Sequence, residues 1–488
     1  MYLQNINNNF NYELEKLCRI FLPFEKIIIT DRFVEDDIYG ITELKSDGGK
    51  TVLSACLYMD GKKVNHSSTV VNSISDYNKE CERELAVQLY RCFTDVTGYS
   101  AEWGILTGVR PAKLYSSLCR SFGEEKAKEY FWGKLLVSEE KISLCKETHS
   151  SEEVIIAKST PDSFSLYISV PFCPTRCSYC SFVSHSVEKS HKLIPDYVEK
   201  LLTEIYYTAH IAKRNNLKLR TVYIGGGTPT TLSAEEIAAV MCAVKENFDL
   251  TNVVEYTVEA GRPDTVTEEK LLAIKENGAT RISINPQTMS DDILQNIGRR
   301  HSVRQTVDAY SLARKIGFDN INMDLIAGLP GDTLENFKET VEQTIALAPD
   351  NVTVHTLSYK RAAYLSTDGD KHSTDNNTAE MVRYARKRLT ENNIFPYYMY
   401  RQSKTVGNLE NVGYARKGAE CLYNVYIMDE THTILACGAS AVTKLREPYG
   451  NKIDRVFNYK YPYEYISRFD EILTRKDNIT KFYEKYNF

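Results

Sequence analysis

The chain has 488 residues, of which 42% are hydrophobic and 26% charged, and its formal net charge is -5. This composition is that of a globular protein with ample core material, and the length exceeds that of one ordinary domain. The acidic balance disfavours nucleic acid as a partner, and no apolar run approaches the roughly 18 residues that a membrane span needs. Because the first residues carry neither a basic leader nor a long apolar stretch, we expect a cytoplasmic protein without a membrane span.

Residues 1–160 predict a small N-terminal α+β domain. The strand-like runs "KIIIT" and "TVLSACLYM" precede helical runs such as "ERELAVQLYRCFTDV" and "PAKLYSSLCRSF". Strands grouped before helices are typical of α+β architecture. These residues do not indicate a chemical role for the domain.

Residues 161–360 alternate short β-branched runs with longer amphipathic stretches, which predicts parallel strands joined by crossover helices. Ser233 and Glu236 form a capping box, and Gly278 and Gly317 end helices. We predict an α/β fold with an incomplete six-unit (β/α) TIM-like barrel, because a closed barrel of this type has more strands. The predicted strands are Leu166–Val170, Thr221–Ile224, Val253–Val258, Arg281–Ile284, Ile321–Ile326 and Val352–Leu357.

Residues 361–488 predict a C-terminal α+β extension, which we expect to cover the active site of the barrel. The segment "AEMVRYARKRLTENN" has helical periodicity, and "CLYNVYIMDETHTILACGASAV" is typical of two strands around a polar turn. No low-complexity linker marks the borders near 160 and 360.

The twelve cysteines are spread thinly, so most of them, including Cys437, are expected to be buried thiols. The exception is "YISVPFCPTRCSYCSF", which places Cys173, Cys177 and Cys180 directly after the first barrel strand. Structural zinc would need a further ligand, for which only His185 is nearby. Three close cysteines without a fourth fit an iron–sulfur cluster with one open iron, and packed thiols are the alternative. The spacing favours the cluster.

Polar residues recur where the other predicted strands end. The glycines of "GGGTPT", residues 225–227, let backbone N–H groups approach a ligand closely. Active sites of β/α barrels gather at the C-terminal ends of the strands, although each such residue could also be a cap or a solvated loop residue. The candidates after the later strands are Glu259, Gln287, Asp324 and Ser358.

The pattern Cys-x3-Cys-x-aromatic-Cys at the end of a first barrel strand resembles the signature of radical S-adenosylmethionine (radical SAM) enzymes. The resemblance implies a [4Fe–4S] cluster held by Cys173, Cys177 and Cys180, with Tyr179 as the aromatic residue. It implies one or two molecules of S-adenosylmethionine, which the reduced cluster cleaves to methionine and a 5′-deoxyadenosyl radical. It also implies an electron donor of the reduced flavodoxin or ferredoxin type.

A narrower resemblance covers about residues 160–445. The segments "YIGGGTPT", "TVEAGRPD", "RISINPQTMSDDILQNIGRRH" and "MDLIAGLPGDT" resemble the motifs of oxygen-independent coproporphyrinogen III oxidases and their coproporphyrinogen dehydrogenase-like relatives. This implies a haem-biosynthesis oxidoreductase that works without oxygen and converts two propionates of coproporphyrinogen III to vinyl groups, giving protoporphyrinogen IX. The implied S-adenosylmethionine contacts are Tyr167, Gly226, Gly227, Thr228, Glu259, Gln287, Arg299, Asp324, Ser358 and Val442.

A tetrapyrrole or haem partner would need cations and flat apolar walls. Arg300, Arg401 and the segment "FPYYMYRQ" are available for this, although solvated arginines and core tyrosines are the simpler reading. His301 and His355 are expected to be ordinary core or loop residues.

The chain departs from the oxidase pattern at two positions, and three functions remain open. Authentic oxidases carry a fourth cysteine where this chain has Phe182 and a histidine where it has Ser169. A related haem chaperone is one alternative, but Tyr423 stands where its histidine would be and no tryptophan follows. An anaerobic haem-degrading enzyme of the same superfamily is another. The N-terminal "EWGILTGVRPAKL" resembles the longer coproporphyrinogen dehydrogenase-like branch and favours the oxidase.

Overall fold

A computed structural model describes residues 1–34, 36–72, 75–180, 185–358, 376–402 and 404–486. These residues form two compact units. The first comprises the described parts of Met1–His149, Asp370–Asn376 and Tyr400–Glu410, and the second those of Ser150–Gly369, Asn377–Met399 and Asn411–Phe488. No helix among the described residues is long and apolar enough to cross a membrane.

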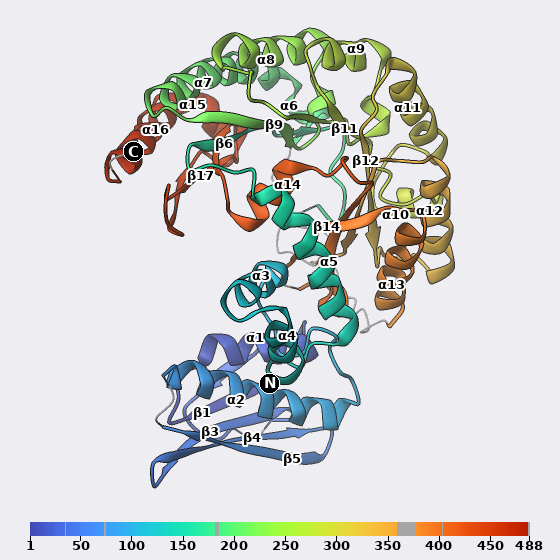
Figure 1. Ribbon diagram of the computed structural model, residues 1–488. Coiled ribbons are helices and arrows are strands. Elements are labelled where there is room, and N and C mark those ends of the chain that lie inside the picture. Colours follow the sequence, from blue (N-terminus) through green and yellow to red (C-terminus); the bar gives the residue numbers. More distant parts are fainter. Residues whose placement is uncertain (35, 73–74, 181–184, 359–375, 403, 487–488) are drawn as a thin grey trace. The chain divides into compact units, whose positions relative to one another are not determined.

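Unit 1 is an α+β structure in which a five-stranded sheet, of order β2-β1-β3-β4-β5, carries the long helix α2 on one face (Figure 1). In β4 every second side chain is buried, including Leu53, Ala55 and Leu57, as expected for a sheet with one covered face. The elements are β1 Tyr2–Ile6, α1 Asn11–Phe21, β2 Ile28–Thr30, β3 Tyr39–Asp47, β4 Lys50–Met59, β5 Lys62–Val71, α2 Tyr77–Thr97, α3 Pro111–Phe122, α4 Glu124–Glu129, the π-helical turn Tyr130–Lys134 and α5 Glu139–Ile156, which runs on into unit 2.

A buried ionic cluster fixes the segment Tyr400–Glu410 within unit 1. Lys141 Nζ lies 2.7 Å from Glu410 Oε1 and 2.9 Å from Glu102 Oε2, and Trp103 Nε1 donates to Glu410 Oε2 at 2.7 Å. Burial alone would lower the pKa of Lys141, but the two carboxylates outweigh it and raise that pKa. The lysine therefore stays charged, and it ties a late segment of the chain to the N-terminal unit.

Unit 2 is built on an eleven-stranded sheet of order β14-β15-β13-β12-β11-β10-β9-β6-β16-β17-β18. The strands β6, β9, β10, β11, β12 and β13 are parallel neighbours, and each of the six segments predicted as a barrel strand contributes one of them. The strands of the sheet are β6 Ser163–Val170, β9 Lys218–Gly226, β10 Glu255–Glu259, β11 Arg281–Ser283, β12 Ile321–Ala327, β13 Asn351–Thr356, β14 Phe395–Arg401, β15 Glu410–Ala415, β16 Thr433–Cys437, β17 Val442–Arg446 and β18 Ile453–Phe457.

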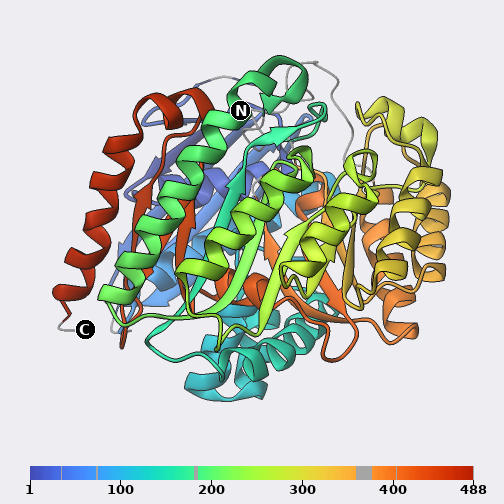
Figure 2. The same cartoon turned by 90° about the horizontal axis from the view of Figure 1, so that it is seen from above.

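Helices form the outer layer of the curved sheet (Figure 1). They form where predicted: Ser233 and Glu236 make both hydrogen bonds of a capping box, and Gly317 ends its helix at a φ of 97°. The C-terminal helix α16 lies beside α7 (Figure 2). The helices are α6 Val187–Ser190, α7 Ile194–Arg214, α8 Ala234–Asn247, α9 Glu268–Glu276, α10 Asp291–Asn296, α11 Val303–Ile316, α12 Leu334–Ala346, α13 Asn376–Glu391, α14 Leu422–Asp429, α15 Pro462–Ser467 and α16 Phe469–Glu484.

The C-terminal segment joins the barrel sheet, since β16 pairs in parallel with β6. One prediction here was wrong, because "LYNVYIMD" is the helix α14 and only the later part of that segment forms strands. The reason is a distant carboxylate: buried Glu255 accepts the N–H groups of Leu422 at 2.7 Å and Tyr423 at 3.1 Å. A negative charge on the free N–H groups of a first turn stabilises a helix. The three-part division at 160 and 360 stays a prediction.

A second buried ion pair holds α16 to the barrel. Lys476 Nζ lies 3.0 Å from Glu204 Oε1 on α7, and both side chains are almost fully buried. Glu204 also accepts from the Gly438 N–H at 2.7 Å and from the Tyr465 hydroxyl at 2.6 Å. The pair therefore anchors the turn between β16 and β17 as well as the last helix.

Replacing Lys476 with methionine should lower the free energy of unfolding of unit 2 by about 3–5 kcal/mol, because Glu204 would stay in the core without its cation. Urea denaturation measures the change. The control is Arg214→Met, whose exposed pair with Glu484 should contribute less than about 1 kcal/mol. Equal losses in the two variants would contradict the prediction.

Candidate active site

The end of β6 and the glycine run at the end of β9 lie unusually close together. The Gly227 N–H donates to the Val170 carbonyl at 2.8 Å, and the Thr228 N–H donates to the Phe172 carbonyl at 2.7 Å. A Cβ at Gly227 would come within 2.6 Å of the Phe172 oxygen and 2.8 Å of the Val170 oxygen. Only glycine fits at this position, so the glycine run allows the close backbone contact that fixes the start of the cysteine loop.

The cysteine loop is held on two further sides. The strand β7 (Phe172–Cys173) pairs with β8 (His185–Ser186), which closes the base of the loop. On the other side the Ser178 N–H donates to the Ile297 carbonyl at 3.1 Å, and the Thr175 hydroxyl donates to the Gly298 carbonyl at 3.1 Å. The loop is thus fixed to the segment that follows α10.

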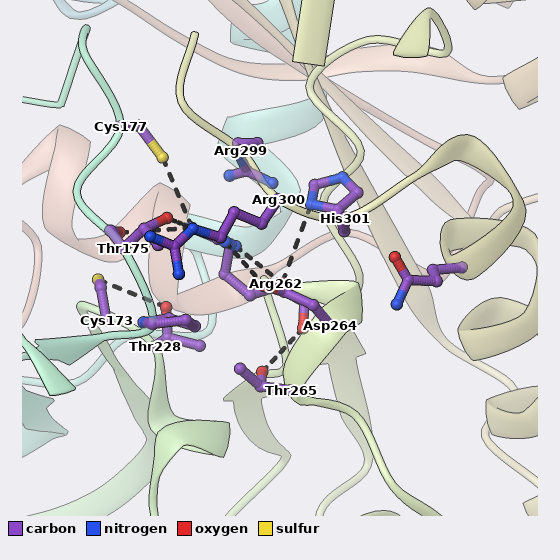
Figure 3. A network of polar contacts seen from close by, with 12 residues as sticks. Cys173, Thr175, Cys177, Thr228, Arg262, Asp264, Thr265, Arg299, Arg300 and His301 are labelled. Carbon is purple, nitrogen blue, oxygen red and sulfur yellow. Dashed lines mark hydrogen bonds and ion pairs between the residues drawn. The ribbon is translucent and has the colours of Figure 1, made fainter. Parts of the chain in front are cut away.

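Polar donors reach two of the three cysteine sulfurs (Figure 3). Thr228 Oγ1 lies 3.5 Å from Cys173 Sγ, and Arg262 Nη1 lies 3.8 Å from Cys177 Sγ. Among the described residues no group of His, Cys, Asp or Glu side chains could hold a single metal ion. A cluster takes one thiolate per iron, so its ligands need not meet at one point. Three thiols on one loop, with N–H and O–H donors facing the sulfurs, fit an iron–sulfur cluster.

Arg299 lies next to the cysteine loop and is almost fully buried. Its Nη1 donates to the Asn285 carbonyl at 2.6 Å, and its Nε donates to the Tyr179 hydroxyl at 3.2 Å. Burial would lower the pKa of Arg299, but the nearby Tyr179 and Cys177 oppose this and the net shift is upward. Arg299 therefore brings a permanent positive charge to the loop.

Glu259, at the end of β10, faces the glycine run. The Tyr223 hydroxyl donates to Glu259 Oε1, and a Cβ at Gly225 would lie 2.9 Å from the Glu259 carboxyl carbon. Burial raises the pKa of Glu259 to about 7, and the Asp324 carboxylate acts in the same direction. The hydrogen bond from Tyr223 opposes both. Glu259 is therefore a carboxyl that changes protonation near neutral pH.

Three tyrosines stack beside Glu259. The ring centroids of Tyr223 and Tyr423 are 4.5 Å apart, and those of Tyr167 and Tyr423 are 6.1 Å apart, with nearly parallel planes. Tyr167 and Tyr223 occupy paired positions of β6 and β9, and Tyr423 comes from α14. Burial keeps the pKa of Tyr423 well above its usual range. The result is a neutral aromatic wall at the end of the barrel.

Asp324 lies on β12, and Gln287 follows β11 and forms an isolated parallel bridge with Leu325 of β12. Gln287 has a φ of 71°, which is rare outside glycine, and its backbone bonds to Asp324 and Ile326 at 2.9 Å each hold it there. Asp324 Oδ1 accepts from Asn322 Nδ2 at 2.8 Å, and Oδ2 lies 3.8 Å from His355 Nε2. Burial would raise the pKa of Asp324, but His355 and Asn322 outweigh it and lower that pKa.

The remaining predicted residues divide into those at this end of the sheet and those elsewhere. Ser358 follows β13, and Val442 begins β17, which starts at the end of the sheet where β6 finishes. Arg300 is exposed and pairs with Glu188 at 2.6 Å. Arg401 belongs to unit 1, where its guanidinium donates to the Leu106 and Asn408 carbonyls. Phe182 lies outside the described residues.

An open cleft of about 610 Å³ adjoins the cysteine loop. Thr175 and Arg176 line it from the loop, and the rest of its lining is Asp291, Gln295, Gly298, Arg299, Arg300, His301 and Ser302. Two of the predicted residues, Arg299 and Arg300, therefore share this cleft.

Sequence reasoning missed four residues of the site, namely Tyr223, Tyr423, Arg262 and His355. His355, expected to be an ordinary core or loop residue, lies beside Asp324. Tyr223 could have been found from strand register, because it pairs with Tyr167. Arg262 lies in the segment "TVEAGRPD", but its contact with Cys177 is distant in sequence, and Tyr423 stacks on residues of distant segments.

Comparisons with known proteins agree with this geometry. A family model described as the radical SAM superfamily matches residues 167–344. The oxygen-independent coproporphyrinogen-III oxidase-like protein HemZ of Bacillus subtilis is 38% identical over 386 residues, covering 78% of this chain and 77% of that protein. The heme chaperone HemW of Haemophilus influenzae is 31% identical over 327 residues, covering 66% of this chain and 80% of that protein.

Among solved structures, coproporphyrinogen III oxidase (HemN) from Escherichia coli aligns with a TM-score of 0.50 and 22% identity, over 65% of this chain and 71% of that one. This likeness shows the α/β radical SAM fold. The barrel and its three-cysteine loop define a protein of the radical SAM class, whose members use a [4Fe–4S] cluster and S-adenosylmethionine. The chain belongs to the family of oxygen-independent coproporphyrinogen III oxidase-like radical SAM proteins.

The raised pKa of Glu259 predicts a pH dependence of stability in the protein without cofactors. Between the ordinary glutamate pKa, about 4.3, and a pKa of about 7 the folded state binds the extra proton, so stability falls as the pH rises through this window. Glu259→Gln should remove this fall, as measured by urea denaturation from pH 5 to 7. Glu342→Gln is the control: Arg388 lowers the pKa of this carboxyl, which is therefore ionised in both states across the window, so this variant should keep the wild-type slope. A wild-type slope in Glu259→Gln would contradict the prediction.

Proposed function

We propose that this protein is a radical SAM enzyme that decarboxylates two propionates of coproporphyrinogen III without oxygen, giving protoporphyrinogen IX. The observation that carries the proposal is the extent of the match to the oxidase-like relative, which covers 78% of the chain. Residues 150–488 make up only about 69% of the chain, so that match includes part of unit 1. The Haemophilus influenzae chaperone covers 66% of the chain.

The proposal assigns the cluster to Cys173, Cys177 and Cys180. When bound, it supplies the electron that makes S-adenosylmethionine a source of the 5′-deoxyadenosyl radical. The chain's own contribution is to fix the three thiols through the close backbone contact at Gly227 and the contacts of the loop with Ile297 and Gly298. A rigid loop would hold the three thiols in a fixed arrangement at the end of the barrel, where the cluster would be bound.

The proposal assigns S-adenosylmethionine to polar side chains at the same end of the sheet. Arg299 offers a buried cation for the carboxylate of the ligand. Glu259 can accept from the amino group or the ribose, and Gln287 can both donate and accept. The backbone of residues 226–228 leaves room for close approach. The full proposed contact set is Tyr167, Tyr179, Gly226, Gly227, Thr228, Glu259, Gln287, Arg299, Asp324, Ser358 and Val442.

The aromatic wall suits a flat substrate. Tyr167, Tyr223 and Tyr423 present hydrocarbon rings beside Glu259 and exclude water from the site of hydrogen abstraction. Each propionate would lose one hydrogen atom, carbon dioxide and one electron, and a one-electron acceptor must take the last of these. Arg300 in the neighbouring cleft is a candidate partner for a second carboxylate.

A haem chaperone is the second candidate, because the match to the Haemophilus influenzae relative of that name covers 80% of that protein. Two observations bear on it. Tyr423 stands where the resemblance places the histidine of the chaperones, and its ring is buried in the tyrosine stack. Ser169, where oxidases carry histidine, is buried against Gly226, so the oxidase contact at that position is also changed. Either reading places the protein in the cytoplasm, with a flavodoxin or ferredoxin as electron donor for the enzyme.

The cluster assignment predicts the metal content of single variants. Anaerobically reconstituted protein should carry about four iron and four sulfide per chain, and Cys177→Ala should lose most of both. The matched control is Cys437→Ala, a fully buried thiol within hydrogen-bonding distance of Thr208, which should keep the cluster. Full metal content in Cys177→Ala would refute the assignment.

The reaction predicts a specific product pair. Reconstituted protein with reductant, S-adenosylmethionine and coproporphyrinogen III should form 5′-deoxyadenosine together with a two-vinyl porphyrinogen, measured by chromatography and mass spectrometry. Arg299→Met, which removes the buried cation proposed for the ligand carboxylate, should raise the S-adenosylmethionine concentration needed. Deoxyadenosine without the vinyl product would indicate another radical substrate. Stoichiometric haem binding without turnover would favour the chaperone.

A further inference from the structure

Arg262 is a buried arginine to which the proposed function gives no role. It follows β10, in the short stretch before the turn Pro263–Thr265, and only 3% of its surface is exposed. A buried guanidinium must find acceptors for its N–H groups, and these acceptors fix its direction. The hydrogen-bond acceptors of Arg262 therefore define the orientation of its guanidinium.

One side of the guanidinium is clamped by a carboxylate. Arg262 Nε and Nη2 donate to the two oxygens of Asp264 at 2.9 Å each, a two-point fork that leaves little rotational freedom. Burial would raise the pKa of Asp264, but Arg262 outweighs it and lowers that pKa. The partner thus stays ionised and the fork stays closed.

The other side points at the cysteine loop (Figure 3). Nη1 donates to Thr175 Oγ1 at 3.2 Å and lies 3.8 Å from Cys177 Sγ. Cys177 is buried, so this N–H group meets the sulfur away from solvent. In a medium of low dielectric constant such a contact is stronger than at the surface.

The neighbouring histidine does not weaken the ion pair between Arg262 and Asp264. His301, whose Nδ1 lies 3.9 Å from Asp264 Oδ1, is buried, and burial lowers its pKa to about 3. The imidazole is therefore neutral and does not compete for the carboxylate as a cation. Arg299 also faces the Cys177 sulfur, and its interaction with Cys177 is one of the causes of its own raised pKa.

From this geometry we propose that Arg262, clamped by Asp264, is a positioning residue that donates a charge-assisted N–H···S bond to Cys177 and thereby raises the reduction potential of the cluster. The proposal rests on the assignment of Cys177 as a cluster ligand. Hydrogen bonds to the sulfurs and local charge are among the factors that set the potentials of iron–sulfur clusters. A positive group beside a thiolate stabilises the electron added on reduction, so the reduced cluster becomes more stable relative to the oxidised one.

The test is the midpoint potential of the reconstituted cluster without S-adenosylmethionine, followed by electron paramagnetic resonance during titration with dithionite. Arg262→Met should shift the reduced-to-oxidised equilibrium at least about tenfold toward the oxidised form, which is about 59 mV more negative for a one-electron couple. Arg262→Lys, which keeps the charge, should recover part of that shift. Arg304→Met, which removes an exposed arginine of α11, is the control and should keep the wild-type potential.

A merely structural role would lower the iron content without moving the potential of the clusters that remain. A second variant, Arg262→Gln, removes the charge but keeps an N–H donor, and it should shift the potential in the same direction by less than Arg262→Met. A wild-type midpoint in whichever of these two variants retains its cluster would overturn the proposal. Wild-type protein that binds no cluster, or Cys177→Ala that keeps it, would instead refute the ligand assignment.

Discussion

The close approach of two parallel strands is the constraint on which this site depends. Strands β6 and β9 pair without interruption from Ser165 to Val170 of β6, and beyond that point the backbones come so near that Gly227 has no room for a Cβ. Two further hydrogen bonds, from Gly227 and Thr228, extend the pairing into the cysteine loop. The loop therefore begins as a continuation of the sheet, and the hydrogen bonds to the strands fix the position of its first residues.

The neighbours of the ionisable groups around the loop determine the protonation state of each group. Asp264 and Asp324 are held ionised by cationic or hydrogen-bonding neighbours, whereas His301 is kept neutral by burial. Glu259 alone among these groups titrates near neutral pH. Fixed dipoles and charges of this kind cost no reorganisation when a ligand arrives, which is how enclosed sites stabilise charged intermediates.

Most of the framework could be predicted from the sequence because its signals are local. The six barrel strands, the capping box at Ser233 and the glycine that ends α11 all form as expected. The segment of α14 was wrongly predicted as a strand, because the carboxylate that accepts the first N–H groups of the helix belongs to Glu255, 167 residues earlier in the chain. The contact of Arg401 with the Leu106 carbonyl likewise spans a long stretch of sequence, so the pattern around Arg401 did not predict it. Hydrophobic periodicity and secondary-structure propensity depend on neighbouring residues in the sequence, so they do not predict contacts with distant residues.

Placement of the segment Tyr400–Glu410 in unit 1 has a consequence for how the chain can be divided. A shortened protein that began at Ser150 would retain Glu410 but lose Lys141, Glu102 and Trp103, which surround it. The strand β15 would then start with an orphaned carboxylate that had been almost wholly shielded from solvent. Cutting away the N-terminal part would therefore bury an uncompensated charge, which is strongly destabilising.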